Sequence, residues 1–276
     1  MGLTIYNNVE AMNAHRALMG TQSSMSRSME RLSSGLRINR AADDAAGLAV
    51  SEVMRSNIRG QQVASRNAQD GVSLVQVADG ALGNLGDMLQ RIRDLAVQAS
   101  NGTLTDAQRS NLDAEVQQVL TEVNRVGTDT DFNGIKILAG SVSTAASAVT
   151  LQVGAAAGQT IAFTIGTVST SDLGVSGIAV SSAASASAAI ASIDAAISTI
   201  TTNRANLGAT QNRLEQTISR LGLMAENLQG AESRVRDADM AQEMIKFTKA
   251  QVLQQSGMSM LAQANQAPQS VLSLLR

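Results

Sequence analysis

The sequence predicts a mainly α-helical fold: a long antiparallel helical bundle or coiled coil built from both ends of the chain, with a small β-hairpin region in the middle. Two observations carry this prediction. Apolar residues recur at alternating spacings of three and four in both halves, which is the helical period. Between Lys136 and Asp194 the only charged residue is Asp172, so the middle of the 276-residue chain is a different kind of structure.

Two long helices are expected in the N-terminal half. The first stripe consists of Val75, Ala78, Leu82, Leu85, Leu89, Ile92, Ala96 and Ala99, and the second of Leu112, Val116, Val119, Val123 and Val126. Between them, Asn101-Gly102 predicts a helix end, and Thr105 with Gln108 predicts a capping box that starts the next helix.

Three glycines interrupt the first of these helices, namely Gly80, Gly83 and Gly86. Each costs about 1 kcal/mol relative to alanine in a helix interior. Either the close approach of a neighbouring backbone or a local kink would account for them.

The middle of the chain carries turn and strand patterns. Asn133-Gly134 stands between an aromatic residue and an Ile-x-Ile alternation, which predicts a hairpin. Alternating small and β-branched residues at 151–154, 160–166 and 173–180 predict short strands separated by glycines.

A further long helix is expected in the C-terminal half. Its stripe consists of Ile193, Ile197, Ile200, Arg204, Leu207, Gln211, Leu214, Ile218, Leu221, Ala225, Leu228, Glu232 and Val235. A straight helix of this extent is roughly 65 Å long at about 1.5 Å per residue, which predicts a rod. Burying one stripe does not offset the entropy of ordering so long a helix, so helices from the two halves must pack together.

Both ends of the chain carry amphipathic patterns rich in methionine. We expect these ends to be marginal helices that fold fully when a partner buries their apolar stripe. The candidate coil and polymerisation residues are Ile5, Val9, Met12, Leu32, Leu36, Met244, Phe247, Leu253, Leu261, Val271, Leu274 and Leu275.

These patterns divide the chain into five segments. They are the N-terminal half of a core coiled coil (1–40), the N-terminal part of a rod domain (41–140), a Ser/Thr/Ala/Gly-rich β region at the rod tip (141–183), the C-terminal rod helix (184–235) and the C-terminal half of the core coil (236–276).

Composition excludes most catalytic chemistry. The chain has no cysteine and one histidine, His15, which removes thiol catalysis and any triad that needs a second histidine. It has no HExxH motif and no glycine-rich phosphate loop. A net charge of −2 gives no footprint for nucleic acid or an anionic membrane. We therefore expect no enzyme, no catalytic, cofactor or metal site, no nucleic acid partner and no membrane insertion.

The chain resembles the bacterial flagellins over about five sixths of its length. Four stretches carry the resemblance: MERLSSGLRINRAADDAAGLAVSEVMRSNIRGQQVASRNAQDGVSLVQVADGAL from Met29, LQRIRDLAVQASNG from Leu89, TDFNGIKIL from Thr130, and SRVRDADMAQEMIKFTKAQVLQQSGMSMLAQANQAPQSVLSLLR from Ser233. Flagellins often carry a large outer domain in the middle of the chain. This sequence is similar to a short member with at most a vestigial one.

The resemblance implies a structural subunit that forms a helical homopolymer, the flagellar filament, and transmits motor rotation as propulsion. It implies an extracellular location reached through the flagellar type III export channel without a cleaved signal peptide. The implied partners are other copies of the chain, an export chaperone at residues 240–276, the hook-associated junction proteins and the filament cap. The Ser/Thr-rich middle is a candidate surface for O-glycosylation.

Two groups of site residues follow from the resemblance. Arg37, Arg40, Asp43 and Asp44 lie where the core coil joins the rod, and we expect them to form pairs that orient the two; alternatively, the aspartates cap the following helix. Arg91, Leu95 and Glu115 match positions read by the host Toll-like receptor for flagellin, and Gln90 lies beside them in the candidate receptor-binding group. The competing interpretation of this second group is ordinary exposed helix positions and filament contacts.

Two other classes stay open at this point. A hook–filament junction protein shares the helical termini, and a monomeric helical receptor agonist or adhesin would use the rod surface alone. Deleting the termini separates these classes, because only a filament subunit should lose polymerisation.

Overall fold

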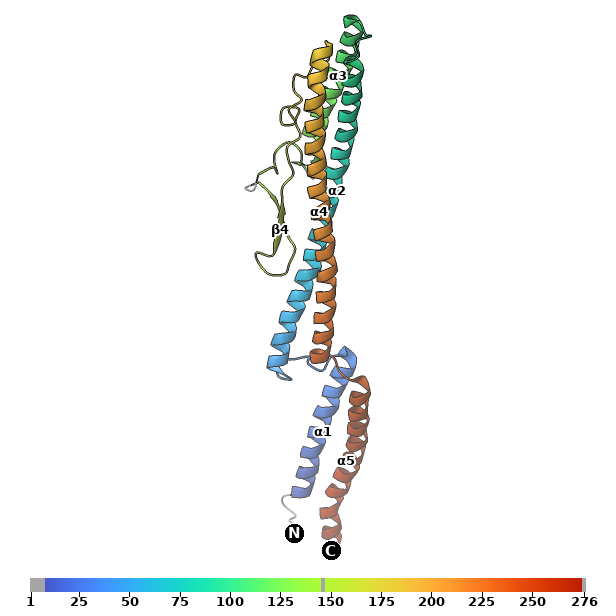
Figure 1. Cartoon of the computed structure of the whole chain (residues 1–276). Helices are drawn as coiled ribbons and strands as arrows, with labels where there is room; N and C mark the ends of the chain where they lie inside the picture. Colours follow the sequence, from blue (N-terminus) through green and yellow to red (C-terminus); the bar gives the residue numbers. More distant parts are fainter. Residues whose placement is uncertain (1–7, 145–146, 275–276) are drawn as a thin grey trace. The chain divides into compact units, whose positions relative to one another are not determined.

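The computed structural model describes residues 8–144 and 147–274, with side chains described up to residue 266. Its helices are α1 (Val9–Ser34), α2 (Ala45–Ala99), α3 (Asp106–Asp129), α4 (Ala183–Arg236) and α5 (Met240–Leu274) (Figure 1). Its strands are β1 (Asp131–Phe132), β2 (Ile135–Lys136), β3 (Val149–Gln152) and β4 (Thr160–Phe163). The predicted mainly α-helical class with small hairpins is confirmed.

The described chain forms two compact units. Unit 1 consists of Met1–Ser56 and Asn227–Arg276, and unit 2 consists of Asn57–Glu226. Helices α2 and α4 contribute to both. The domain limits expected near residues 40 and 236 lie close to the breaks between α1 and α2 and between α4 and α5, and they stay predictions as domain limits.

The core of unit 2 is formed by the predicted stripes. Every stripe residue of α2 from Val75 to Ala99 has a solvent-exposed fraction of 0%. On α4 the exposed fractions are 0% at Ile193 and Leu214 and 2% at Ile200 and Leu207, with Ile197 and Ile218 packed against this core. The alternating spacing therefore marked the buried faces correctly, and the two halves of the chain do pack on each other.

Side-chain hydrogen bonds fix the start of α3. The Thr105 hydroxyl accepts from the Gln108 backbone N–H at 3.4 Å, and the Gln108 side chain accepts from the Thr105 N–H at 2.9 Å. This is the predicted capping box. Arg109 is buried and donates to the carbonyl oxygens of Ala99 and Asn101 at 2.9 and 3.0 Å, which holds the end of α2 against the start of α3.

The three glycines Gly80, Gly83 and Gly86 of α2 do not accommodate a neighbouring backbone of this chain. No described heavy atom would lie within 4 Å of a Cβ at Gly80 or Gly86, and the nearest to Gly83 is Cζ of Arg204, at 4.0 Å. The expected close approach is therefore wrong for these positions. It occurs instead at Gly127 of α3, where a Cβ would lie 2.5 Å from the Val168 carbonyl oxygen.

The predicted hairpin at Asn133-Gly134 is present. Strands β1 and β2 pair Phe132 with Ile135, and Asn133 and Gly134 both have positive φ (51° and 80°), as a two-residue type I′ turn requires. Strands β3 and β4 form a second antiparallel pair, from Val149 opposite Phe163 to Gln152 opposite Thr160.

The strand expected at 173–180 is not formed. Gly174 and Gly177 adopt φ values of 68° and 78°, which break the extended backbone into turns. Apolar side chains of this segment, such as Val175 and Val180, are nonetheless buried.

The middle segment lies along the sides of the unit 2 helices, where Figure 1 shows it, rather than at a tip. The Asn67 amide of α2 donates to the Gln152 carbonyl oxygen at 3.0 Å. The Gln117 amide of α3 donates to the Ile178 carbonyl oxygen at 2.7 Å, and the Val180 N–H donates to the Asp113 carboxylate at 2.7 Å. The physical reason is that the segment's own buried residues join the core of α2, α3 and α4.

Candidate functional site: the paired terminal helices

Helices α1 and α5 of unit 1 pack against each other in antiparallel orientation. The Asn8 amide donates to the Ala264 carbonyl oxygen at 2.8 Å, the Gln254 amide donates to Gln22 Oε1 at 2.6 Å, and the Ser28 hydroxyl donates to Glu243 Oε1 at 2.8 Å. As the residue numbers of the contacting positions increase along α1, those along α5 decrease, as antiparallel packing requires.

Local signals in the sequence bound α1 at both ends. The Asn8 side chain accepts from the Ala11 N–H at 3.0 Å and caps the N-terminus. Gly35 adopts a left-handed φ of 73°, and its N–H donates to the Arg31 carbonyl oxygen at 2.9 Å.

The residues that face the partner helix repeat at spacings of three and four. On α1 these half-buried or buried residues are Ala11, Ala14, Leu18, Thr21, Met25, Ser28 and Leu32, and on α5 they are Glu243, Phe247, Ala250, Gln254, Gly257, Leu261 and Ala264. Among the described side chains of the two helices, only Ser28, Glu243 and Ala250 are fully buried. This seam is therefore narrow, and half of its residues are small.

Large apolar side chains remain exposed outside the seam. Their exposed fractions are 57% for Val9, 60% for Met12, 61% for Met19, 49% for Met244, 68% for Ile245, 65% for Val252, 50% for Leu253, 51% for Met258 and 59% for Met260. Such a set of apolar side chains on paired helices is typical of a surface that binds another protein. We call these nine residues the outer apolar face.

The structure divides the predicted coil residues into two groups. Leu32, Phe247 and Leu261 are half-buried in the seam, and Leu36 is half-buried beside the α1 terminus. Val9, Met12, Met244 and Leu253 belong to the outer apolar face. Ile5 and Leu275 and the side chains of Val271 and Leu274 lie outside the described residues.

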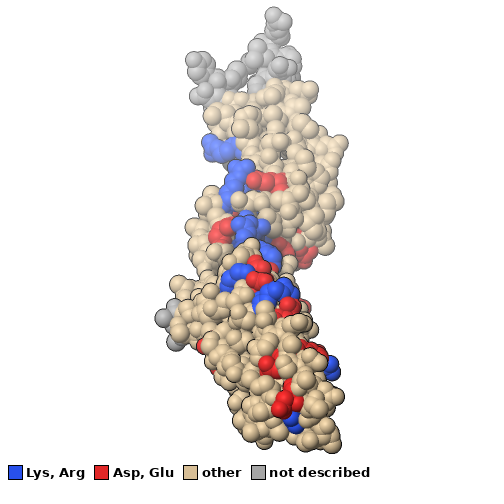
Figure 2. All heavy atoms as spheres, turned by 90° about the horizontal axis from the view of Figure 1, so that it is seen from above, with Lys and Arg blue, Asp and Glu red and all other residues tan. Residues whose placement is uncertain are grey.

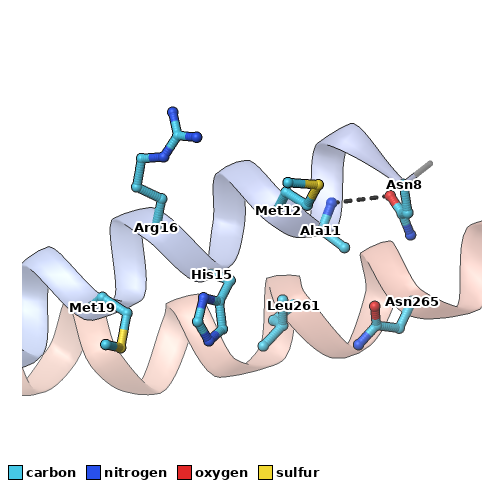
Figure 3. Close-up of a pocket in the computed structure, with 8 residues that line it drawn as sticks. All are labelled: Asn8, Ala11, Met12, His15, Arg16, Met19, Leu261 and Asn265. Atoms are coloured by element: carbon cyan, nitrogen blue, oxygen red, sulfur yellow. Dashed lines mark hydrogen bonds between the residues drawn. The ribbon is translucent and has the colours of Figure 1, made fainter.

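A shallow pocket lies beside one end of the pair, lined by Asn8, Ala11, Met12, His15, Arg16, Met19, Leu261 and Asn265. In Figure 3, His15 projects toward Leu261 of α5 while Arg16 points away from α5. No group of three or more His, Cys, Asp or Glu side chains that could hold a metal ion occurs among the residues the structure describes.

We expected Arg37, Arg40, Asp43 and Asp44 to pair with one another where the core coil joins the rod. Only Arg40 and Asp43 contact each other, and the remaining contacts are with other residues. The Arg37 guanidinium donates to the Val235 carbonyl oxygen at 2.6 Å, and Arg40 pairs with Glu30 at 2.9 Å. Asp44 accepts from the Gly47 N–H at 2.8 Å, so it caps α2, as the competing interpretation expected.

Asp43 holds the turn that precedes α2. Its carboxylate accepts from the Arg40 N–H at 3.1 Å and the Asn39 N–H at 3.3 Å, and lies 3.5 Å from Arg31. The backbone hydrogen bond from Arg40 is the main cause that lowers the pKa of Asp43. The role of these residues in orienting coil and rod stays a prediction.

Sequence reasoning missed Glu243, the buried acid of the seam. Besides the Ser28 hydroxyl, its carboxylate accepts from Lys246 Nζ at 3.0 Å and lies 3.9 Å from Arg31. Burial acts most strongly on this carboxyl and alone would raise its pKa, but the hydrogen bonds from Lys246 and Ser28 outweigh burial and leave the pKa lowered. A glutamate at a seam position of the three-and-four spacing was the signal that could have revealed it.

The four candidate receptor residues divide between surface and core. Arg91 and Glu115 form an ion pair at 2.6 Å between α2 and α3, with 58% and 42% of their side chains exposed, and Gln90 is exposed beside them. Leu95 is only 2% exposed and belongs to the core of unit 2. The expectation that Leu95 is a surface contact is therefore wrong, because its side chain lies on the buried face of α2.

Charges of both signs mix on the face seen in Figure 2, with Lys and Arg next to Asp and Glu. Helix α4 contains one window of mean hydropathy 1.4, long and apolar enough by composition to cross a membrane. Its stripe instead packs in the core of unit 2.

Comparison with known proteins was consistent along the whole chain. Residues 5–143 match the family model of the bacterial flagellin N-terminal helical region, and residues 190–275 match that of the bacterial flagellin C-terminal helical region. The chain is 47% identical to the flagellar filament 33 kDa core protein of Treponema phagedenis and 48% identical to a flagellin of Halalkalibacterium halodurans. Both likenesses cover 99% of this chain and 100% of the relative.

Solved structures show the same fold. The crystal structure of Bacillus cereus flagellin is similar with a TM-score of 0.50 and 32% identity, over 56% of this chain and 88% of that one. A putative flagellar hook-associated protein from Vibrio parahaemolyticus shares the fold with a TM-score of 0.55 over 71% of this chain and 98% of that one, at 15% identity.

The helical pair with its outer apolar face and the helical core together define a structural subunit built to pack against neighbours. The chain belongs to the bacterial flagellin family. It is a structural subunit of the flagellar filament, which lies outside the cell, and it is not an enzyme.

Proposed function

We propose that this chain polymerises through the outer apolar face of α1 and α5, and that the resulting filament transmits motor rotation as propulsion. The single observation that carries the proposal is the exposure of nine large apolar side chains on these two helices. Burying a Val, Leu, Ile or Met side chain contributes about 1.5 to 3 kcal/mol. Burial against neighbouring copies therefore supplies the energy that the narrow α1·α5 seam lacks.

Seeded polymerisation of the purified full-length chain tests this proposal. Ile245→Glu places a charge where the side chain is 68% exposed, and we expect it to abolish or strongly reduce polymer mass measured by sedimentation. Gln251→Glu adds the same charge at an exposed polar position of α5 and serves as the matched control. Equal polymerisation of both variants would contradict the proposal.

Truncation provides a second test. A chain without its first and last 40 residues or so retains the unit 2 core and should stay folded but monomeric under negative-stain microscopy. Filaments formed by this truncated chain would show that the termini are not needed.

The same outer apolar face supports the proposed partners before and after export. An export chaperone bound at residues 240–276 would mask Met244, Ile245 and Leu253 until the chain leaves through the type III channel without a cleaved signal peptide. Junction proteins and the cap would cover the faces left open at the two ends of the polymer. Chaperone capture by full-length protein, and its loss in the Ile245→Glu variant, tests the first of these partners.

Recognition by the host Toll-like receptor for flagellin is a second proposed function. The exposed surface formed by Gln90, Arg91 and Glu115 supports it, because an arginine held by a neighbouring carboxylate is a rigid anchor for a protein interface. Receptor-reporter activation by monomeric Arg91→Ala should fall below that of the parent. Equal signalling would contradict the assignment.

A further inference from the structure

We propose that Glu243 is the positioning residue that sets the axial register of the α1·α5 pair. The inference concerns pairing inside one chain, so it does not rest on the proposed assembly surface. Glu243 is the one charged side chain among the three buried residues of the seam, and the other two, Ser28 and Ala250, are small.

Packing around Leu18 alone specifies the register weakly. Opposite Leu18 of α1 lies Gly257, where a Cβ would be 3.3 Å from Leu18 Cδ1. One heptad away on either side, α5 offers Ala250 and Ala264, which are also small. A slip by one heptad therefore places small residues opposite Leu18 again, and packing distinguishes these alignments poorly.

Glu243 distinguishes them because its partners on α1 occur at one position only. In the observed register, the Ser28 hydroxyl donates to Oε1 at 2.8 Å, and Arg31 lies 3.9 Å from the same oxygen. Both Glu243 and Ser28 are buried, with exposed fractions of 4% and 5%. The carboxylate is thus removed from water and satisfied by α1 together with Lys246 of its own helix.

Slipping the pair removes this compensation. If Glu243 moved one heptad toward the start of α1, it would face Thr21 in place of Ser28, and Ser24 in place of Arg31. The Thr21 hydroxyl already donates to the Ala17 carbonyl oxygen. One heptad the other way, it would face Gly35, where α1 has ended. Since a buried charge without partners is strongly unfavourable, both slipped alignments are disfavoured.

Disulfide trapping tests the register directly, because the natural chain contains no cysteine. Full-length variants carry Leu18→Cys together with Gly257→Cys for the observed register, or with Ala250→Cys or Ala264→Cys for the two slipped ones. Each variant is oxidised in seeded filaments, and intramolecular bonds are separated from intermolecular ones by mass. In the parent background we expect the Leu18–Gly257 pair to form at least about tenfold more than either slipped pair, since breaking a buried ion pair is strongly destabilising.

Replacing the carboxylate should erase this preference. In a Glu243→Leu background the slipped pairs should approach the observed pair in yield, while helix content by circular dichroism stays unchanged. Glu10→Leu, the same replacement at an exposed position of α1, is the matched control and should retain the parent preference. An unchanged preference in Glu243→Leu would overturn the proposal.

An exchange variant keeps the test decisive if Glu243→Leu does not assemble. Ser28→Glu combined with Glu243→Ser moves the carboxylate across the seam, where Arg31 and Lys246 still flank it. This variant should restore the Leu18–Gly257 preference, and slipped crosslinks from it would refute the inference. Polymer mass is measured separately by sedimentation, so a failed assembly surface is not mistaken for a failed register.

Discussion

Helices α2 and α5 carry apolar residues at similar helical spacings but bury them to very different extents. Every stripe residue of α2 between Val75 and Ala99 has no solvent exposure, because α3, α4 and the middle segment cover it. On α5, Ile245 and Val252 are 68% and 65% exposed. An amphipathic pattern therefore marks a surface to be covered: for α2 the covering partner lies within the chain, and for α5 we propose that it is supplied by neighbouring copies.

The largest expected effect comes from a large-to-small substitution in each of the helices α2 and α5. Leu85→Ala removes a side chain with 0% exposure and should lower the free energy of unfolding of the monomer by about 2 to 5 kcal/mol. Leu253→Ala, at 50% exposure, should leave monomer stability nearly unchanged and raise the critical concentration for polymerisation instead. Chemical denaturation and sedimentation measure the two effects. Equal losses of monomer stability would remove the distinction between the helices.

The next largest effects on monomer stability are expected from glycine-to-alanine substitutions in unit 2. Gly127→Ala forces a Cβ against the Val168 carbonyl oxygen and should destabilise the monomer by about 1 to 3 kcal/mol. Gly80→Ala enters open space and should stabilise α2 by about 0.5 to 1 kcal/mol. Opposite signs in thermal unfolding are the expected result, and a matching sign for the two variants would contradict the contacts described at Gly127.

How far the sequence predicted these features depends on how local their causes are. The stripe of α2, the Thr105 capping box and the Asn133-Gly134 turn are encoded within a few residues, and each was predicted. The close contact at Gly127 was not predictable in this way, because it depends on a segment packed from elsewhere in the chain. Glu243 was missed for the same reason, since its partner Ser28 lies 215 positions away.

Acid should loosen the terminal helices before it unfolds unit 2. The pKa values of Glu243 and Asp43 are lowered in the folded chain. Their ionised carboxylates therefore stabilise the fold at pH values above the ordinary pKa of these groups. This stabilisation is lost as the pH falls through their lowered, folded-state pKa values. Arg31 and Lys246 are the basic groups that face Glu243. Hydrogen exchange of α1 and α5 in filaments, measured relative to the intrinsic amide exchange rate at each pH, should rise between about pH 5 and pH 3.

The Glu243→Gln variant is the control for this acid effect. Its amide keeps a hydrogen-bond acceptor for Ser28 but cannot titrate, so the rise in exchange should be smaller. An identical pH profile would assign the acid sensitivity to other groups.

The smallest expected effect concerns the Arg91–Glu115 pair of unit 2. Both side chains are largely exposed, and exposed ion pairs contribute about 0 to 1 kcal/mol. Arg91→Ala should therefore change the thermal midpoint by little, which makes it suitable for receptor assays. A large loss of stability would show that the pair supports the fold.

Helices α2, α3 and α4 complete their core within unit 2, whereas we propose that α1 and α5 complete theirs in the polymer. Hydrogen–deuterium exchange, compared segment by segment between monomer and filament, tests this claim most directly. We expect the amides around Leu82 and Leu207 to be protected in both states, and those of α1 and α5 to exchange rapidly in the monomer and slowly in the filament. Strong protection of α1 and α5 in the monomer, equal to that around Leu82, would contradict the account.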